Sequence, residues 1–243
     1  MKIDLQELQQ LAAVQPREDM YAAIHKALRA FMADTLLALG RVDVDDDADL
    51  ARVTGQVVDL VDFCLSHLQH ENAFVHTAIE ARAPGASAAI AHDHIDHERE
   101  IAELRSAAQD LRQLEAALRP AAAHGLYRAL AVFVAENMLH MNVEETAHNA
   151  LLWSRYTDVE LRAIHDALVA SIPPQELMLG LRWMLPFMTP RERLGMLTGI
   201  RAQAPAPAFA AILDVVRPHL GEREWAKLAR GLGIDAVPGL TAG

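Results

Sequence analysis

Apolar residues recur every three or four positions along the first two thirds of the chain, the spacing of one face of an α-helix. Four long segments show this pattern, at about residues 18–39, 47–82, 86–118 and 120–155. Gly40, the pair Pro84-Gly85, and Pro120 separate them, at points where helices end or begin. Short connections between long helices predict antiparallel neighbours. The sequence therefore predicts an all-α fold built on an antiparallel up-down four-helix bundle.

The pattern changes after about residue 156. Prolines become frequent and divide residues 157–243 into short helical stretches. The segment Thr189-Pro190-Arg191-Glu192 is typical of a helix start, with a capping threonine, a proline in the first turn and a capping-box glutamate. We interpret Trp183 and Trp225 as packing residues. The predicted domains are a four-helix bundle at 1–156 and a C-terminal module of short helices, of unknown role, at 157–243.

The composition favours packed helices, and the net charge excludes some classes of binding partner. The chain is 52% hydrophobic and only 5% aromatic, which favours helices over sheets. Its formal net charge of -11 argues against nucleic acid and anionic membranes, which would repel it. No apolar run approaches a membrane span, and residues 1–19 lack the apolar stretch of a signal peptide. With a lone cysteine, Cys64, these features predict a soluble cytoplasmic protein.

Histidine and glutamate interrupt the core-facing stripes of the long helices. In steps of three and four residues, the second helix gives Val53, Val57, Leu60, Cys64, His67, Glu71, Phe74 and Ala78. The fourth helix repeats this pattern with Leu126, Leu130, Phe133, Asn137, His140, Glu144, Ala147 and Leu151. The third stripe contains His94 and His97, and the first contains His25. Each long helix is therefore expected to bring an imidazole into the core.

The two inward-facing glutamates indicate a metal. A buried carboxylate costs several kcal/mol unless it is paired or bound to a cation, and no Lys or Arg lies on these stripes. In each pair, His and Glu are four residues apart and share one helix face. Imidazole and carboxylate donors suit a first-row transition metal, and one carboxylate from each of two helices can bridge two ions. The predicted ligands are His25, His67, Glu71, His97, His140 and Glu144.

The third helix offers alternative ligands. We prefer His97, then His94, then Asp93, which lies four residues before His97. Tyr21 lies one turn before His25, so its hydroxyl either approaches the metal or stays at the end of the bundle as part of a core aromatic residue.

Two further core positions and the remaining histidines complete the set of candidates. Cys64 and Asn137 each lie three residues before a predicted histidine ligand. Either is a candidate for additional contact with the site, although we interpret the cysteine as packing and the asparagine as a hydrogen-bond partner. The other histidines fall off the stripes or outside the bundle and are predicted to be solvated: His70, His76, His92, His124, His148, His165 and His219.

Four short segments, within about residues 16–155, carry a combined motif. They are Ile24-His25-Lys26-Ala27-Leu28-Arg29, His67-Leu68-Gln69-His70-Glu71, Asp96-His97-Glu98 and His140-Met141-Asn142-Val143-Glu144-Glu145. Together they resemble the hemerythrin-like, or HHE cation-binding, family. The resemblance implies a four-helix bundle with an oxo- or hydroxo-bridged non-haem di-iron site. It also implies terminal ligands His25, His67, His97 and His140, with Glu71 and Glu144 as bridges.

Two departures from the family bear on function. Oxygen-carrying hemerythrins space two third-helix histidines four residues apart and close with His-x-x-x-x-Asp. Here the spacing is three and the closing pair is His-x-x-x-Glu. Iron-centre repair members carry an N-terminal segment with cysteine, and residues 1–19 contain none. Neither oxygen transport nor iron-centre repair is therefore favoured.

Three functions stay open. The preferred one is binding or sensing of oxygen, nitric oxide or redox state, because the expected pocket residues Tyr21, Leu60, Phe74 and Phe133 favour a small neutral ligand. The second is a di-iron enzyme that acts on peroxide or ferrous iron. The third is iron storage, iron donation or a purely structural metal. Residues 157–243 are expected to offer a surface for a homo-oligomer or a protein partner.

Overall fold

The structure is a computed structural model and describes residues 17–236. Every regular element in that range is a helix, so the prediction of an all-α chain is confirmed for the residues described. Among those residues, we find no helix with both the length and the apolar character needed to cross a bilayer. The predictions made for residues 1–16, including the lack of a signal peptide, and for residues 237–243 lie outside the described part.

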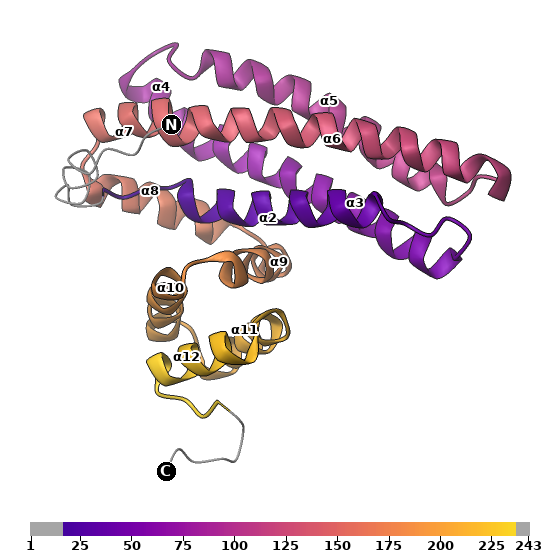
Figure 1. Cartoon of the computed structure of the whole chain (residues 1–243). Coiled ribbons are helices and arrows are strands. Elements are labelled where there is room, and N and C mark those ends of the chain that lie inside the picture. The colour runs from indigo at the N-terminus through magenta and orange to yellow at the C-terminus, as the bar shows by residue number, and fades with distance from the viewer. Residues whose placement is uncertain (1–16, 237–243) are drawn as a thin grey trace, which may run out of the picture.

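Four long helical segments lie side by side and are called the four-helix group (Figure 1). The first segment is α2 and the third is α5. The second consists of α3, the π-helix η1 and α4, and the fourth consists of α6, the π-helix η3 and α7. The bounds are α2 Ala22–Leu39, α3 Asp47–His70, η1 Glu71–His76, α4 Thr77–Arg82, α5 Ala88–Leu111, α6 Arg119–Val143, η3 Glu144–His148 and α7 Asn149–Arg155. Both α2 and α5 contact α3 and α6, so the four segments enclose one core.

The third long helix ends earlier than predicted. It stops at Leu111, and the chain then turns through a short 3-10 stretch, η2 Ala116–Leu118, before α6. Arg119 holds this turn, because its guanidinium donates hydrogen bonds to the carbonyl oxygens of Leu114 and Val44. Pro120 then occupies the first turn of α6, where its missing N–H costs nothing.

The predicted stripes describe the core well up to the two glutamates. Beyond them Ala78 is buried as predicted, but the other predicted positions are displaced by one residue. Beyond Glu71, Val75 is buried while Phe74 is half-buried, and beyond Glu144, Leu152 is buried while Ala147 is exposed. Leu151 is likewise only half-buried, so Phe74, Ala147 and Leu151 were predicted wrongly. The reason is the π-helix that begins at each glutamate. Its wider turn holds about one more residue than an α-helical turn, so the side chains that follow point in a different direction around the helix axis.

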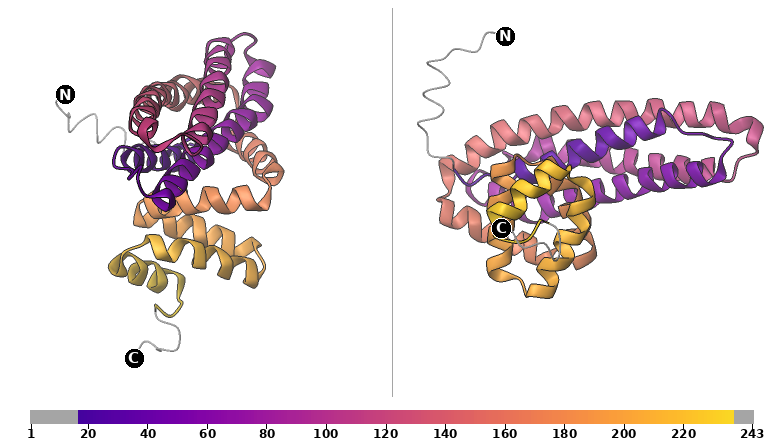
Figure 2. Two further views of the ribbon diagram at one scale, coloured as in Figure 1. Left: turned by 90° about the vertical axis from the view of Figure 1, so that its right-hand side faces the viewer. Right: turned by 60° about the horizontal axis from the view of Figure 1, so that its bottom comes forward.

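The remaining elements, called the C-terminal helices, lie against α2 on one side of the four-helix group (Figures 1 and 2). They are α8 Asp158–Ser171, α9 Pro174–Met184, η4 Leu185–Phe187, α10 Pro190–Gln203, α11 Ala206–Val216, η5 Arg217–His219 and α12 Glu222–Leu232. The predicted start of α10 is confirmed, since Thr189 and Glu192 form a capping box. Trp183 of α9 stacks on Phe31 of α2 with 4.2 Å between ring centroids, so it packs as predicted.

Two ion pairs also join the C-terminal helices to the four-helix group. Arg82 of α4 contacts Glu160 of α8 at 2.5 Å, and Lys26 of α2 contacts Glu192 of α10 at 2.7 Å.

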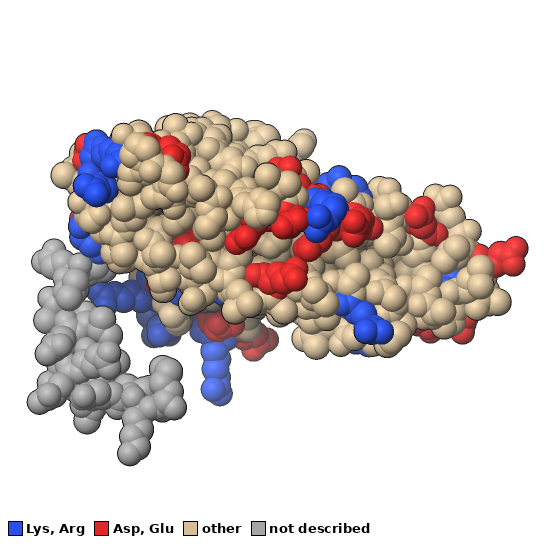
Figure 3. All heavy atoms as spheres, turned by 90° about the horizontal axis from the view of Figure 1, so that it is seen from above, with Lys and Arg blue, Asp and Glu red and all other residues tan. Residues whose placement is uncertain are grey.

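On the face over α5 and α6, acidic side chains gather near the middle of a largely uncharged surface (Figure 3).

Candidate metal centre

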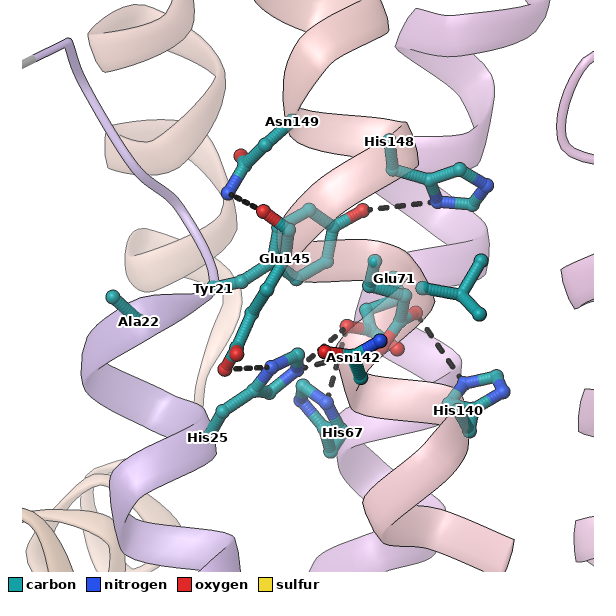
Figure 4. Close-up of polar contacts among 12 residues, drawn as sticks. Tyr21, Ala22, His25, His67, Glu71, His140, Asn142, Glu145, His148 and Asn149 are labelled. Atoms are coloured by element: carbon teal, nitrogen blue, oxygen red, sulfur yellow. Dashed lines mark hydrogen bonds and ion pairs between the residues drawn. The ribbon is translucent and has the colours of Figure 1, made fainter. Parts of the chain in front are cut away.

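Histidine and glutamate side chains from all four long segments converge inside the four-helix group. Two sets of possible donor atoms each lie within 4.8 Å of one another: His25, His67, Glu71 and Glu144 form one, and Glu71, His94, His140 and Glu144 form the other. The two sets share both glutamates. The structure thus brings together five of the six predicted ligands, and in Figure 4 the rings of His25, His67 and His140 turn toward the carboxylates between the helices.

Both carboxylates are buried and lack hydrogen-bond donors. Glu71 is 2% exposed and Glu144 is fully buried, and no hydrogen bond reaches any of their four side-chain oxygens from the described residues. Within residues 17–236, neither pairs with a lysine or an arginine. The nearest basic groups are imidazoles, with His67 Nε2 at 3.1 Å from Glu71 and His140 Nε2 at 3.3 Å from Glu144.

The two carboxyl groups differ in their tendency to ionise. Burial and the negative charge of Glu71 raise the pKa of Glu144. Burial acts in the same direction on Glu71, but His67 and His25 outweigh it and hold the pKa of Glu71 well below its usual range. Two carboxylates that share one buried space therefore depend on positive charge between them.

His25 is held by a carboxylate on its outer side. Its Nδ1 donates to Glu145 at 3.0 Å, and Glu145 also accepts two hydrogen bonds from Arg29. Burial lowers the pKa of His25, but Glu145, Glu71 and Glu144 raise it to about 9. This arrangement fixes the ring and leaves Nε2 facing Glu71 and Glu144, as an outer carboxylate does for metal-binding histidines.

His94 is oriented in a similar way by an amide. Its Nδ1 donates to the side-chain oxygen of Asn72 at 2.8 Å, so its Nε2 points inward and lies 3.1 Å from Nε2 of His140. Burial lowers the pKa of His94 to about 3, which leaves its ring neutral and able to bind a cation at pH 7. Sequence reasoning did not identify Asn72 or Glu145 as supporting residues.

The predictions for His76 and His148 were wrong. Both were expected to be solvated, yet they are 5% and 4% exposed, and together with Glu144 they form a third set of possible donors within 4.8 Å. Each follows a core glutamate by one π-helical turn, at a spacing of five residues for His76 and four for His148. A histidine about one turn beyond each glutamate is a sequence signal that could have identified them.

Tyr21 connects to this third set. It is buried, and its hydroxyl lies 3.3 Å from Nδ1 of His148, as the dashed line in Figure 4 shows. Burial and the charges of Glu71 and Glu144 raise the pKa of the Tyr21 hydroxyl well above its usual value, so it stays protonated. The hydroxyl therefore lies beside the candidate ligands rather than at the end of the helix group.

The remaining candidates lie outside the convergent sets. His97 is buried with its Nδ1 unpaired, and its ring centroid is 4.9 Å from that of His140. Asp93 is largely exposed, 3.7 Å from the outer nitrogen of His140. On the third helix, the structure thus places His94, and neither His97 nor Asp93, within a convergent set.

Cys64 and Asn137 do not contact the candidate ligands through polar atoms. The thiol is buried among apolar residues, which raises its pKa to about 12. The Asn137 amide donates to the Phe133 carbonyl oxygen of its own helix at 2.8 Å. Of the other histidines predicted to be solvated, His92, His124 and His219 are exposed, while His70 and His165 are half-buried.

The donor atoms fit a transition-metal ion. Atoms about 2 Å from a common ion lie roughly 3 Å apart, which is close to the separations of 3.1 to 3.7 Å between Glu71 and its histidines. A bound cation would also satisfy the unpaired carboxylate oxygens. These groups are therefore able to hold a metal ion.

No protein-family model, curated protein or solved structure matches this chain.

Proposed function

We propose that this protein is a hemerythrin-like non-haem di-iron protein that binds or senses oxygen, nitric oxide or redox state. The four-helix group would be its antiparallel up-down bundle, and His25, His67, His94, His140, Glu71 and Glu144 its ligands. The observation that carries this proposal is the pair of buried glutamates whose oxygens accept no hydrogen bond from the described residues and have no described lysine or arginine beside them. Buried carboxylates of this kind destabilise the fold unless a cation or a hydrogen-bond donor compensates them.

Two ions fit the donors better than one. The two convergent sets share Glu71 and Glu144 but take different histidines, His25 and His67 in one and His94 and His140 in the other. A carboxylate has two oxygens and can bridge neighbouring ions, so each set supplies two histidines and two bridges. His97, His76 and His148 are further neutral imidazoles close to the same space.

Iron agrees with the chemistry of the donors. Imidazole and carboxylate ligands without thiolate suit iron, manganese or zinc, whereas a site for soft ions would use cysteine. The resemblance to the hemerythrin-like family favours iron among these. When bound, a pair of iron ions supplies one-electron redox chemistry and open positions for a small ligand.

The low solvent exposure of the candidate ligands favours gas or redox sensing. Among the residues of the two convergent sets, the His67 side chain is the most exposed at 12%, and the others are almost completely enclosed. The Tyr21 hydroxyl and the neutral ring of His148 are the groups that would orient a small ligand there. An enclosed site of this kind admits a diatomic molecule more easily than a polar substrate.

The proposal is tested by reconstituting the protein anaerobically with ferrous iron. We expect close to two irons per chain by elemental analysis. Stopped-flow absorbance with oxygen, nitric oxide and peroxide should then show a reversible adduct with one of the diatomic ligands. Rapid consumption of peroxide would instead favour the enzyme alternative, and failure to retain iron would overturn the proposal.

Matched variants identify the ligands. Glu71→Ala and Glu144→Ala should each lose at least one iron, whereas His124→Ala, at an exposed histidine of the same helix as His140, should keep both. On the third helix, His94→Ala should weaken iron binding more than His97→Ala. The reverse order would restore the original preference for His97 as the third-helix ligand.

A further inference from the structure

A cavity of about 340 Å³ lies between the four-helix group and the C-terminal helices. Most of its wall is apolar. Ile24 and Phe63 contribute from the four-helix group, and Leu168, Leu181 and Ile200 contribute from α8, α9 and α10. Its volume is at the small end of the range for small-molecule sites, which are typically apolar with a few polar groups.

One part of the cavity reaches the candidate metal centre. Tyr21, His67 and Glu71 line it, and His67 is the ligand candidate whose side chain is least enclosed. The donor atoms themselves, His67 Nε2 and the Glu71 oxygens, remain buried, so the cavity lies beside the centre rather than on the ions. A molecule held there would occupy the approach to the metal centre from the C-terminal helices.

The charges along the cavity restrict what it can hold. The described lining includes no lysine or arginine. Besides Tyr21, its polar side chains are three carboxylates and three histidines: Asp19, Glu71, Glu176, His67, His70 and His165. Glu176 already accepts a hydrogen bond from Ser66 and lies 3.8 Å from His70. An anionic head group would therefore meet negative charge without a lysine or arginine in the described lining to pair with it, which disfavours a fatty acid or a phosphate ester.

We propose that this cavity binds an uncharged, mainly apolar organic molecule, held between α3, α8, α9 and α10 with one end beside His67. The C-terminal helices then have a direct role, because they form much of the wall that the four-helix group lacks. Binding relies on apolar contacts and not on the metal. It therefore goes beyond the proposed di-iron function and can be tested separately.

The test uses N-phenylnaphthylamine, an uncharged dye whose fluorescence rises in apolar surroundings, with the full chain before and after iron loading. We expect saturable binding of one dye per chain and displacement by decanol. Decanoate has the same chain length with a negative charge and should compete at least about tenfold more weakly than decanol. Lack of saturable binding, or equal competition by decanoate, would overturn the proposal.

Two variants fill the cavity from different walls. Val169→Trp and Ile200→Trp should each weaken dye binding by about tenfold or more, because both residues line the cavity. The matched controls are Ala170→Trp and Ala202→Trp, at exposed neighbouring positions of the same two helices. Circular dichroism melting curves establish that each variant is folded.

The variant results separate the site from nonspecific adsorption. If the controls weaken binding as much as the cavity variants, or if neither folded cavity variant weakens it, the dye binds elsewhere and the proposal fails. Protein that binds dye in this pattern but retains no iron would disprove only the di-iron function. Protein that retains iron but binds no dye would disprove only the cavity proposal.

Discussion

The two parts of the molecule each bury charge, but they treat it in opposite ways. In the C-terminal helices, Arg193 is 2% exposed and donates to the carbonyl oxygens of Leu185, Pro186 and Met188, with Glu224 at 3.4 Å. In the four-helix group, Glu71 and Glu144 are equally buried, yet the described residues donate no hydrogen bond to them.

The presence or absence of hydrogen-bond partners distinguishes a buried charge that stabilises the fold from one that is available to a ligand. A buried charge whose partners are complete stabilises the segment around it, here the turn between α9 and α10. A buried charge without partners destabilises the fold until something binds it. Burial alone therefore does not identify a site, whereas burial with unpaired atoms does.

Removal of metal should have the largest effect. We expect the iron-loaded protein to lose about 4 kcal/mol or more of unfolding free energy on chelation, since the ion binds only the folded cluster. Chemical denaturation with and without chelator measures this difference. A Glu71→Ala, Glu144→Ala double variant should not respond to chelation. A response equal to that of the unmodified protein would place the stabilising metal elsewhere.

Loss of the buried arginine should have the next largest effect. Arg193→Met removes the hydrogen bonds that the guanidinium donates to the carbonyl oxygens of Leu185 and Met188 and should cost about 3 kcal/mol of unfolding free energy. Iron content per folded chain should stay unchanged. Arg191→Met, at an exposed arginine two residues earlier, is the control. If both variants were equally stable, Arg193 would not be structural.

Neutralising one carboxylate of the candidate metal centre should instead raise the unfolding free energy. In metal-free protein at pH 7, Glu144→Gln should raise the unfolding free energy by about 1 kcal/mol, because it removes a poorly compensated buried charge. The folded-state pKa of Glu144 is raised, so its protonated form favours folding. The gain should therefore shrink as the pH falls through that pKa. Destabilisation by Glu144→Gln at pH 7 would contradict this account.

The exposed ion pair between the two parts should give the smallest effect. Arg82 and the capping contacts of Thr157 lower the pKa of Glu160 to about 2. Its stabilising contribution is complete above about pH 4.5, the ordinary value, and is lost as the pH falls through 2. Glu160→Gln should lower the urea midpoint slightly at pH 6 and not at pH 2. A difference that persists at pH 2 would exclude the charge as its cause.

Sequence periodicity predicted the helices and the core up to the glutamates because one apolar face per helix must be buried wherever its neighbours lie. It also identified Glu71 and Glu144, since an acidic residue in an apolar stripe is conspicuous. Beyond them it predicted Ala78 correctly but failed at Phe74, Ala147 and Leu151, because regular helical spacing does not include a π-turn. Phe74 and Ala147 were therefore assigned to the core, and His76 and His148 to the surface.

The sequence by itself determined that the chain is helical and that histidines and two glutamates face a common core, because these follow from local spacing and the cost of burying charge. Only the tertiary structure decided which atoms meet. His94 and not His97 enters the convergent sets, and Asn72 and Glu145 orient the rings. Such choices depend on the rotation and axial offset of neighbouring helices, which packing across the whole core sets.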